Sequence, residues 1–534
     1  MGKVLFGTSH FFKAEGELPV PQGFPEVEQI LSYHGYLSEV KGDIQGSRLF
    51  LTGKIETHLV YRGKEVQDRV SEHGVVWRGE EGAVFNEEIN LPELKADWDW
   101  ELCLVNLILQ PEAAEVVKYH LEIEVKIWAR KSSMVRFIKE IESEKKIQPV
   151  TEQLISEELV LTTYLNREVN NHFPLTYPKP PLARILDCQV IPVDSSATLS
   201  KGRVSIEGKL EVYLVYVTLT DEGKEGGIEA QRWTEDNGGA IPFQIIQDNP
   251  QLSNEFSANH EIRIEGVQMQ SSTPESCRLQ VIINVRVDVV RPKPVKVVLD
   301  LTSEQEEILD IQRGAGEIEE IIGETEKTIM VEKTLLLPSE LKNIGRLLQA
   351  KMSGPKLQLQ TELEQVLITG EAQLGIVYQS QGIDGEESTV EASFWGRGET
   401  EAVSFAEFLE MPGVEDGMQA RIYLNANRLR VEQLDERSIK FTLELKTRVK
   451  VWQSRTLALV KDVVLVIPQD IPKPSMLFYL VQPGDTLWKI ARRYNTTMDS
   501  IISENRLIDP EKEIITGKKL LIPKKLIAKR SVTS

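Results

Sequence analysis

The chain contains little cysteine and no long apolar run. Of its 534 residues only Cys103, Cys188 and Cys277 are cysteine, and they lie far apart. Because no Cys-x-x-Cys pair or Cys/His cluster exists, we predict neither a zinc site nor a disulfide framework, which fits a reducing compartment. No stretch approaches the roughly 18 apolar residues of a membrane span. The first residues also lack the apolar core of a secretory signal, so we expect a cytoplasmic protein.

Catalytic motifs are missing as well. The sequence has no Gly-x4-Gly-Lys-Ser/Thr, His-Glu-x-x-His or Gly-x-Ser-x-Gly motif, and no dinucleotide fingerprint after a strand. The seven histidines are scattered. His58 and His120 alternate with apolar residues in predicted strands, so we expect both side chains to be exposed to solvent. We therefore predict a protein that is not an enzyme and that needs no cofactor or metal.

One cluster of acidic and aromatic residues is compatible with a hydrolase. Asp97 and Asp99 flank Trp98, and Trp100 follows. Paired carboxylates beside aromatic rings can serve sugar hydrolysis. The corresponding places elsewhere in the chain lack these residues, so we interpret the cluster as a decorated loop.

Charge is distributed unevenly along the chain. The formal net charge is −20, which argues against a protein that coats nucleic acid or anionic lipid. Residues 477–534 hold 11 basic and 6 acidic side chains, whereas residues 1–476 hold 51 and 76. A basic C-terminal unit therefore follows a strongly acidic body, and this asymmetry predicts a modular protein.

The acidic body contains three copies of a long repeat. Residues 49–61, 204–216 and 366–378 each alternate apolar and polar side chains and carry a glycine in the same phase, with a tyrosine eight residues later. Alternation of this kind predicts a long strand with one buried face. A glycine in mid-strand predicts a bulge or a close approach of another group. The three glycines are Gly53, Gly208 and Gly370, and the tyrosines are Tyr61, Tyr216 and Tyr378.

Other landmarks keep register with these glycines. An aliphatic residue precedes each glycine by 23 positions, a phenylalanine follows by 32 to 35, and a proline comes seven positions later. In copy order the landmarks are Ile30, Ile185 and Leu347; Phe85, Phe243 and Phe405; and Pro92, Pro250 and Pro412. Units of about 130 residues with several half-buried strands are typical of antiparallel β-sandwich or barrel-like domains. We predict three such domains at residues 10–131, 160–292 and 328–456.

Two segments between the repeats differ in composition. Residues 132–158 include the charged run 139–146, and residues 303–327 are rich in glutamate and contain Gly314 and Gly316. We interpret both segments as solvated linkers or short helices.

The last segment has a different pattern. A short strand at 479–481 is followed by a turn and by a helix whose apolar face holds Leu487, Ile490, Ala491 and Tyr494. Thr497 can cap a second short helix, and residues 519–523 predict a closing strand. The predicted order is β-α-α-β in a fourth domain at residues 476–525.

This segment resembles the LysM domain. The resemblance rests on Tyr479, Val481, Gly484, Asp485, Thr486, Leu487, Ile490, Ala491, Tyr494, Ile501, Asn505, Ile515, Gly517, Leu520, Ile522 and Pro523. LysM domains generally bind glycans that contain N-acetylglucosamine, such as peptidoglycan or chitin, in a shallow groove between two loops. The resemblance implies a groove formed by Gly484, Asp485, Thr486 and Leu487 facing Leu507, Ile508 and Asp509.

Some of these residues also have a purely structural interpretation. Gly484 and Gly517 suit turns, and Asp485 can be only a helix cap. Trp488 lies off the main apolar face, where it can anchor a glycan or a protein or simply cover the core. With Lys489, Arg492 and Arg493 it would form a protein-binding surface, because aromatic and arginine side chains dominate such interfaces.

The arrangement of three β-repeats before one LysM domain resembles the SipL-type spore coat morphogenetic proteins, whose repeats are called SPOCS domains. This resemblance implies a non-catalytic coat assembly scaffold in the mother-cell cytoplasm that docks on the forespore surface. Its LysM domain would bind the morphogenetic ATPase of the coat basement layer, and its repeats other coat proteins. The alternative is a peptidoglycan- or N-acetylglucosamine-binding protein of the cortex or cell wall.

Overall fold

The computed structural model describes most of the chain. The described residues are 2–64, 71–93, 97–113, 115–132, 137–138, 147–175, 179–237, 239–303, 308–382, 388–396, 402–466 and 475–524. They are mainly in strands, and a small helical module lies at the C-terminal end. The three cysteines are free thiols. None of the helices among these residues is long and apolar enough to span a membrane.

Among the described residues, seven strands belong to each of the three repeats. The first repeat consists of β1 (Gly2–Pro19), β2 (Val27–Gln45), β3 (Arg48–Gly63), β4 (Glu72–Trp77), the 3-10 turn η1 (Gly79–Glu81), β5 (Ala83–Asn90), β6 (Asp97–Ala113) and β7 (Val116–Ser132). The second consists of β8 (Ile147–Pro174), β9 (Leu182–Ser200), β10 (Arg203–Leu219), β11 (Glu225–Trp233), β12 (Ile241–Asp248), β13 (Ser257–Thr273) and β14 (Ser276–Ser303). The third consists of β15 (Ile308–Leu336), β16 (Ile344–Glu362), β17 (Gln365–Ser380), β18 (Val390–Trp395), β19 (Val403–Glu410), β20 (Gln419–Gln433) and β21 (Ser438–Val466).

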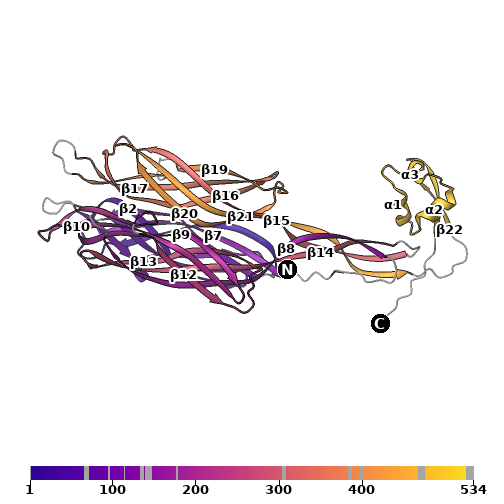
Figure 1. The fold of residues 1–534 in the computed structure, drawn as a ribbon, viewed down its shortest axis with the longest axis horizontal. Coiled ribbons are helices and arrows are strands. Elements are labelled where there is room, and N and C mark those ends of the chain that lie inside the picture. The colour runs from indigo at the N-terminus through magenta and orange to yellow at the C-terminus, as the bar shows by residue number, and fades with distance from the viewer. Residues whose placement is uncertain are drawn as a thin grey trace. The chain divides into compact units, whose positions relative to one another are not determined.

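The three repeats share one topology. In each, the last strand pairs with both the first and the sixth strand, and the other four strands form a second sheet around the third strand. One apolar cluster in each repeat draws buried side chains from both sheets. A two-sheet arrangement around a single core is a β-sandwich, so the predicted fold class is confirmed. Figure 1 shows these long strands as arrows.

The repeated glycines lie beneath phenylalanine rings. Gly53, Gly208 and Gly370 pair across the sheet with Phe85, Phe243 and Phe405. A Cβ added to any of the three glycines would collide with the facing ring. The neighbouring strand also changes register close to each glycine. Both predicted reasons for a mid-strand glycine, a bulge and a close approach, therefore apply.

The repeated tyrosines tie the central strand of each second sheet to the segment just before its neighbouring strand. Tyr61, Tyr216 and Tyr378 are fully buried, and each hydroxyl donates a hydrogen bond to a backbone carbonyl 36 residues earlier in the chain. The O···O distances are 2.9, 3.0 and 2.8 Å. Each tyrosine also pairs with the aliphatic landmark of its repeat, Ile30, Ile185 or Leu347. The spacing seen in the sequence is therefore a cross-strand register repeated three times.

The segments interpreted as linkers contain long strands. Residues 147–158 belong to β8, and residues 308–327, which include Gly314 and Gly316, belong to β15. The charged run 139–146 lies outside the described residues. These strands bury only scattered side chains, such as Leu154 and Ile318, and leave many polar ones exposed. Their composition therefore resembles that of a linker although their backbone is paired.

The acidic cluster near residue 98 is also in a strand and not in a loop. Asp97, Asp99 and both tryptophans begin β6. Trp98 and Trp100 pack against the core of the first repeat. Asp99 Oδ2 lies 2.6 Å from Arg286 Nη2 in the second repeat. Its carboxylate is thus paired with a buried cation.

The described chain forms two compact units. The first contains residues 1–133, 157–293 and 319–453, and the second contains residues 134–156, 294–318 and 454–534. The first unit therefore holds the sandwiches of all three repeats. The ends of β8, β14, β15 and β21 extend beyond the predicted limits 160–292 and 328–456, and those limits remain predictions about independent domains.

Equivalent residues of the three repeats meet in one apolar junction inside the first unit. Leu31, Leu186 and Leu348 each lie 22 residues before the repeat glycine, at a register shift of the second strand. They pack with one another and with Val60, Val215 and Val377, which again occupy equivalent positions. An added Cβ at Gly74 would collide with the carbonyl oxygen of Leu186, so the repeats approach each other at backbone distance.

A polar layer lies next to these leucines. Asp187 is almost fully buried, and its Oδ2 lies 2.6 Å from Lys351 Nζ and 3.0 Å from Gln349 Nε2 of the third repeat. Lys351 Nζ also lies 2.9 Å from His34 Nδ1 of the first repeat. Burial and then the Lys351 charge hold the pKa of His34 well below its usual range. His34 therefore stays neutral beside the buried ion pair.

His58 corrects a prediction. Its side chain is buried, stacks on His34 with ring centroids 4.4 Å apart, and lies with Nε2 2.8 Å from Glu56 Oε1. The face opposite the sandwich core was expected to meet solvent, but another repeat covers it here. His120 is only partly exposed, with Nδ1 3.1 Å from Glu15 Oε1.

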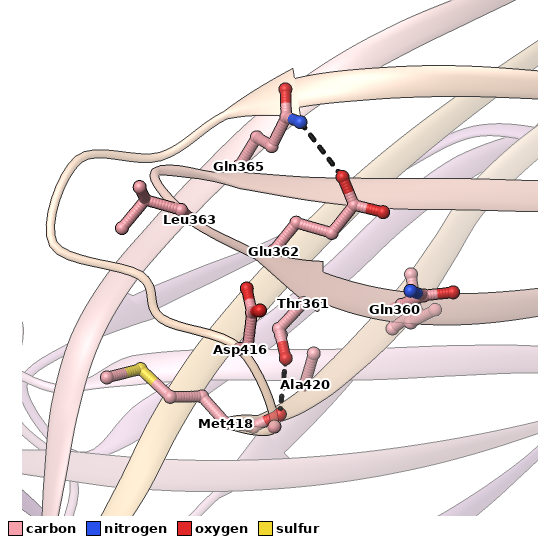
Figure 2. A pocket seen from close by; sticks show the side chains of 10 residues that line it. Gln360, Thr361, Glu362, Leu363, Gln365, Asp416, Met418 and Ala420 are labelled. Atoms are coloured by element: carbon pink, nitrogen blue, oxygen red, sulfur yellow. Dashed lines mark hydrogen bonds between the residues drawn. The ribbon is translucent and has the colours of Figure 1, made fainter.

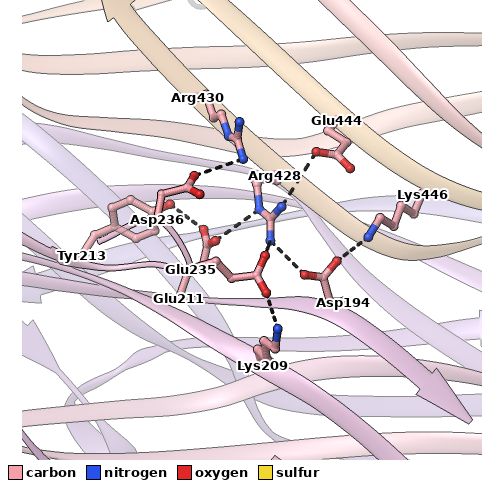
Figure 3. Close-up of polar contacts among 10 residues, drawn as sticks. All are labelled: Asp194, Lys209, Glu211, Tyr213, Glu235, Asp236, Arg428, Arg430, Glu444 and Lys446. Atoms are coloured by element: carbon pink, nitrogen blue, oxygen red, sulfur yellow. Dashed lines mark hydrogen bonds and ion pairs between the residues drawn. The ribbon is translucent and has the colours of Figure 1, made fainter. Parts of the chain in front are cut away.

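The second and third repeats share an ion-pair network around Arg428 (Figure 3). The guanidinium of Arg428 lies 3.0 Å from Asp194, 3.2 Å from Glu211 and 3.3 Å from Glu235. Three carboxylates of one repeat thus share an arginine of the next, which fixes the register between the two sandwiches.

We predict that Gly208→Ala destabilises the protein, since the new Cβ would lie 2.6 Å from Phe243 Cζ. Overpacking of this kind costs about 1–3 kcal/mol. Gly227→Ala in β11 is the matched control, because a Cβ there meets open space. Urea unfolding of the two variants checks the prediction, and equal stability would contradict the role given to the phenylalanine ring.

A shared proton between Glu101 and Glu261 gives a prediction about pH. Burial and the hydrogen bond with Glu101 raise the pKa of Glu261 to about 8. Burial acts to raise the pKa of Glu101 too, but the bond from Glu261 and the charges of Lys126 and Arg421 lower it to about 2. Glu261 is therefore protonated in the folded protein at neutral pH and donates to Glu101.

Between about pH 4.5 and 8 the folded state keeps a proton on Glu261 that the unfolded chain loses, so stability falls as pH rises through this window. Glu261→Gln keeps a donor and removes this proton. We expect the variant to lose less stability than the wild type between pH 5 and 8, by about 1 kcal/mol or more. Urea unfolding at both pH values measures it, with exposed Glu275→Gln as control. Identical pH slopes for Glu261→Gln and wild type would refute the shared proton.

Candidate ligand-binding site

The C-terminal module has the predicted order of elements with one addition. Its elements are β22 (Ser475–Leu480), α1 (Leu487–Arg493), α2 (Met498–Asn505), α3 (Pro510–Glu513) and β23 (Lys519–Lys524). Strands β22 and β23 pair antiparallel, and the helices lie beside them (Figure 1). The short helix α3 was not predicted. A small core of eight buried side chains holds the module together: Tyr479, Val481, Ile490, Ala491, Ile501, Leu507, Leu520 and Ile522.

The first loop is fixed by its own polar side chains. Gly484 has a φ of 81°, a value that favours glycine. Asp485 Oδ2 accepts the Tyr479 hydroxyl at 2.6 Å and the Gln482 amide at 2.8 Å. The Tyr479 bond holds the pKa of Asp485 below its usual value. Thr486 accepts the Lys489 amide at 3.2 Å and so caps α1.

The second loop is held by a residue that the sequence analysis missed. Glu513 Oε1 accepts the backbone amides of Ile508 and Asp509 at 2.8 and 3.0 Å, and Oε2 lies 3.0 Å from Lys518 Nζ. The bonds from Asp509, Lys518 and Ile508 lower the pKa of Glu513 to about 2. A glutamate four residues after Asp509 can reach back to such amides, and this spacing was the signal available in the sequence.

The predicted groove residues divide into two groups. Leu507 is buried, and Leu487 packs against the same core, so both loops contribute to the interior. Ile508 is 94% exposed and Trp488 is 45% exposed.

The charged residues of the site lie around these exposed groups. The Arg492 guanidinium lies 5.0 Å from the Trp488 ring centre. Lys489 Nζ donates to the Gly484 carbonyl at 3.0 Å, and Asp509 pairs with Lys512 at 2.8 Å. Trp488 and Ile508 therefore offer exposed contact surface, whereas Gly484, Asp485 and Thr486 shape the first loop. The Arg492 guanidinium also pairs with Asp300 at 2.9 Å.

Comparison with known protein families supports the assignment of this module. The family model of the LysM domain matches residues 479–523. No curated protein and no solved structure matches the chain. The C-terminal module is thus similar to a LysM domain over residues 479–523, and this likeness supports glycan binding.

The third repeat contains a concave surface. Ten residues around the β16–β17 turn and the start of β20 line a hollow of about 700 Å³ (Figure 2). Thr361 Oγ1 donates to the Met418 carbonyl, and Gln365 Nε2 donates to Glu362, both at 3.0 Å. Among these ten described residues there is no histidine, cysteine or lysine. The ionisable side chains of the hollow are the carboxylates of Glu362 and Asp416, and Glu362 accepts the bond from Gln365.

One cluster has the residue types of a metal site. Ligand atoms of His34, His58 and Asp187 lie within 4.8 Å of one another. The Lys351 ammonium lies 2.6 Å from Asp187 and 2.9 Å from His34, so a side-chain cation already neutralises the carboxylate. We assign this cluster to the junction of the repeats.

We predict that Glu513→Gln loosens the second loop, because a neutral amide is a weaker acceptor for two backbone amides and one ammonium. Hydrogen exchange of the full chain should become at least tenfold faster at Ile508 and Asp509. Glu504→Gln on the exposed side of α2 is the control and should leave this exchange unchanged. Unchanged exchange in Glu513→Gln would remove Glu513 from its anchoring role.

Proposed function

We propose that this protein is a non-catalytic binding protein whose LysM module attaches it to a glycan containing N-acetylglucosamine. The match of residues 479–523 to the LysM domain carries this proposal. Two properties of the module support it. Its loops are fixed before any ligand arrives, and its exposed Trp488 and Ile508 can cover the apolar face of a sugar ring.

The repeats support a role in assembly rather than catalysis. The three sandwiches pack at one junction and together present a large surface. The described residues contain no recognised catalytic set. In this proposal the repeats bind other proteins, and the LysM module provides the specific attachment point.

A second candidate function is the assembly of the spore coat, which the order of the domains suggests. The protein would act in the mother-cell cytoplasm at the forespore surface, where its LysM module would dock on a coat morphogenetic ATPase. One observation favours a protein partner. Strand β22 exposes Met476, Phe478 and Leu480, each by more than half, and Lys519 Nζ lies 4.2 Å from the Phe478 ring centre. An apolar strand face of this kind suits a protein interface.

Sedimentation of the full chain with insoluble peptidoglycan or chitin tests the first candidate. We expect Trp488→Ala to weaken binding at least tenfold, about 1.4 kcal/mol, which is typical of an aromatic anchor. Phe478→Ala is the matched control, since it removes another exposed aromatic side chain from the same module.

The control also separates the two candidates. Loss of glycan binding in Trp488→Ala but not in Phe478→Ala supports the glycan proposal. No sedimentation of the wild-type chain, together with capture of the coat ATPase that Phe478→Ala abolishes, would replace it with the second candidate. A fluorescent fusion that forms a ring around the forespore would support the same replacement.

A further inference from the structure

The three contacts between repeats use the same position of each repeat. Glu56, Glu211 and Gln373 each lie three residues after the repeat glycine, on the central strands β3, β10 and β17. Each of these strands faces another repeat at this position. The three contacts can therefore be compared directly. In two of them this position holds a glutamate.

Carboxylates fill the first two contacts. Glu56 accepts the Val267 amide of the second repeat at 2.9 Å and lies 3.2 Å from Arg78. Glu211 accepts the Tyr213 hydroxyl at 2.8 Å and lies 3.2 Å from Arg428 of the third repeat. In both places the glutamate carboxylate is thus paired within the protein, although Arg78 Nε and Arg428 Nε themselves make no hydrogen bond among the described residues.

The third contact is different. Gln373 stands where the others have glutamate, and its Oε1 has no hydrogen-bond partner among the described residues. Asn106 Oδ1 of the first repeat has none either. Both residues line a cavity of about 210 Å³ that is formed mainly by the first and third repeats, with Gln189 of the second repeat in its wall. At this position the contact therefore contains space and two unpaired amide oxygens in place of an ion pair.

Two more buried polar atoms in the cavity wall lack partners among the described residues. They are His34 Nε2 and Gln189 Oε1, and Gln189 is only 8% exposed. His34 Nδ1 accepts from the Lys351 ammonium at 2.9 Å, so Nε2 carries the ring proton and is a donor. Leaving buried polar atoms unpaired costs about 1–3 kcal/mol each, so something must satisfy them.

The remaining wall indicates what kind of molecule fits. Tyr33, Tyr36 and Phe394 provide aromatic surface, and Tyr33 and Phe394 lie 6.2 Å apart between ring centres. The nearby charge of Lys351 is already matched by Asp187, so the cavity has no excess charge to attract an ion. Amides that both donate and accept, beside aromatic rings, are the groups that bind hydroxyls and the C–H faces of a sugar.

We propose that this cavity is a binding site for a neutral polyhydroxylated molecule the size of one sugar ring. Its volume of about 210 Å³ is many times the roughly 10–15 Å³ that one water needs, so the cavity has room for such a molecule. Its hydroxyls would pair with the amides of Asn106, Gln189 and Gln373 and with His34 Nε2. This site lies in the repeats and is separate from the LysM module.

Calorimetric titration of the full chain carrying Trp488→Ala tests the site, because that substitution weakens the proposed glycan site of the module. The probes are D-glucose, N-acetylglucosamine and myo-inositol. We expect at least one of them to bind, and we expect Asn106→Leu to weaken that binding at least tenfold. Gln110→Leu, on the exposed side of the same strand β6, is the control and should bind as before.

Gln373→Glu provides a second variant, which keeps the size of the side chain, and its folding is checked by urea unfolding. It places an unmatched charge in the cavity and should also weaken binding at least tenfold. Absence of binding by all three probes, or equal affinity in Asn106→Leu, Gln373→Glu and the control, would overturn the proposal. A crystal grown with the probe that shows only water in the cavity would do the same.

Discussion

The packing of Leu31, Leu186 and Leu348 is the contact on which the arrangement of the first unit depends. Each leucine projects from a register shift in its own sandwich, and the three meet with equivalent valines in one buried cluster. Burying each leucine side chain contributes about 1.5–3 kcal/mol. Because the backbones approach closely here, the polar residues beside the leucines are removed from water and must pair with one another.

That constraint explains the chemistry of the junction. Equivalent positions carry Ser32, Asp187 and Gln349, and then His34, Gln189 and Lys351. The three copies have diverged into a set in which one lysine neutralises one aspartate while a neutral histidine accepts a hydrogen bond. Because the three repeats carry different side chains, the contacts at Glu56 and Glu211 contain paired carboxylates, whereas the contact at Gln373 contains a cavity.

Much of the fold could be predicted from the sequence because its reasons are local. The glycine, phenylalanine and tyrosine landmarks correspond to pairs within one sheet, such as Gly208 with Phe243. The LysM-like module follows from helix caps and an apolar stripe. His58, Glu513 and the strands in 147–158 and 308–327 could not be predicted, since their environment comes from residues distant in sequence or from backbone pairing that composition hides.

The sequence by itself determined three sandwich repeats and one LysM-like module, with basic charge confined to the latter. Alternation and turn chemistry are properties of neighbouring residues, so they can be read along the chain. Only the tertiary structure decided which outer faces are buried and which polar atoms lack partners. Burial of Asp187 and His34, and the open contact between Asn106 and Gln373, arise from residues hundreds of positions apart, and no local pattern records such contacts.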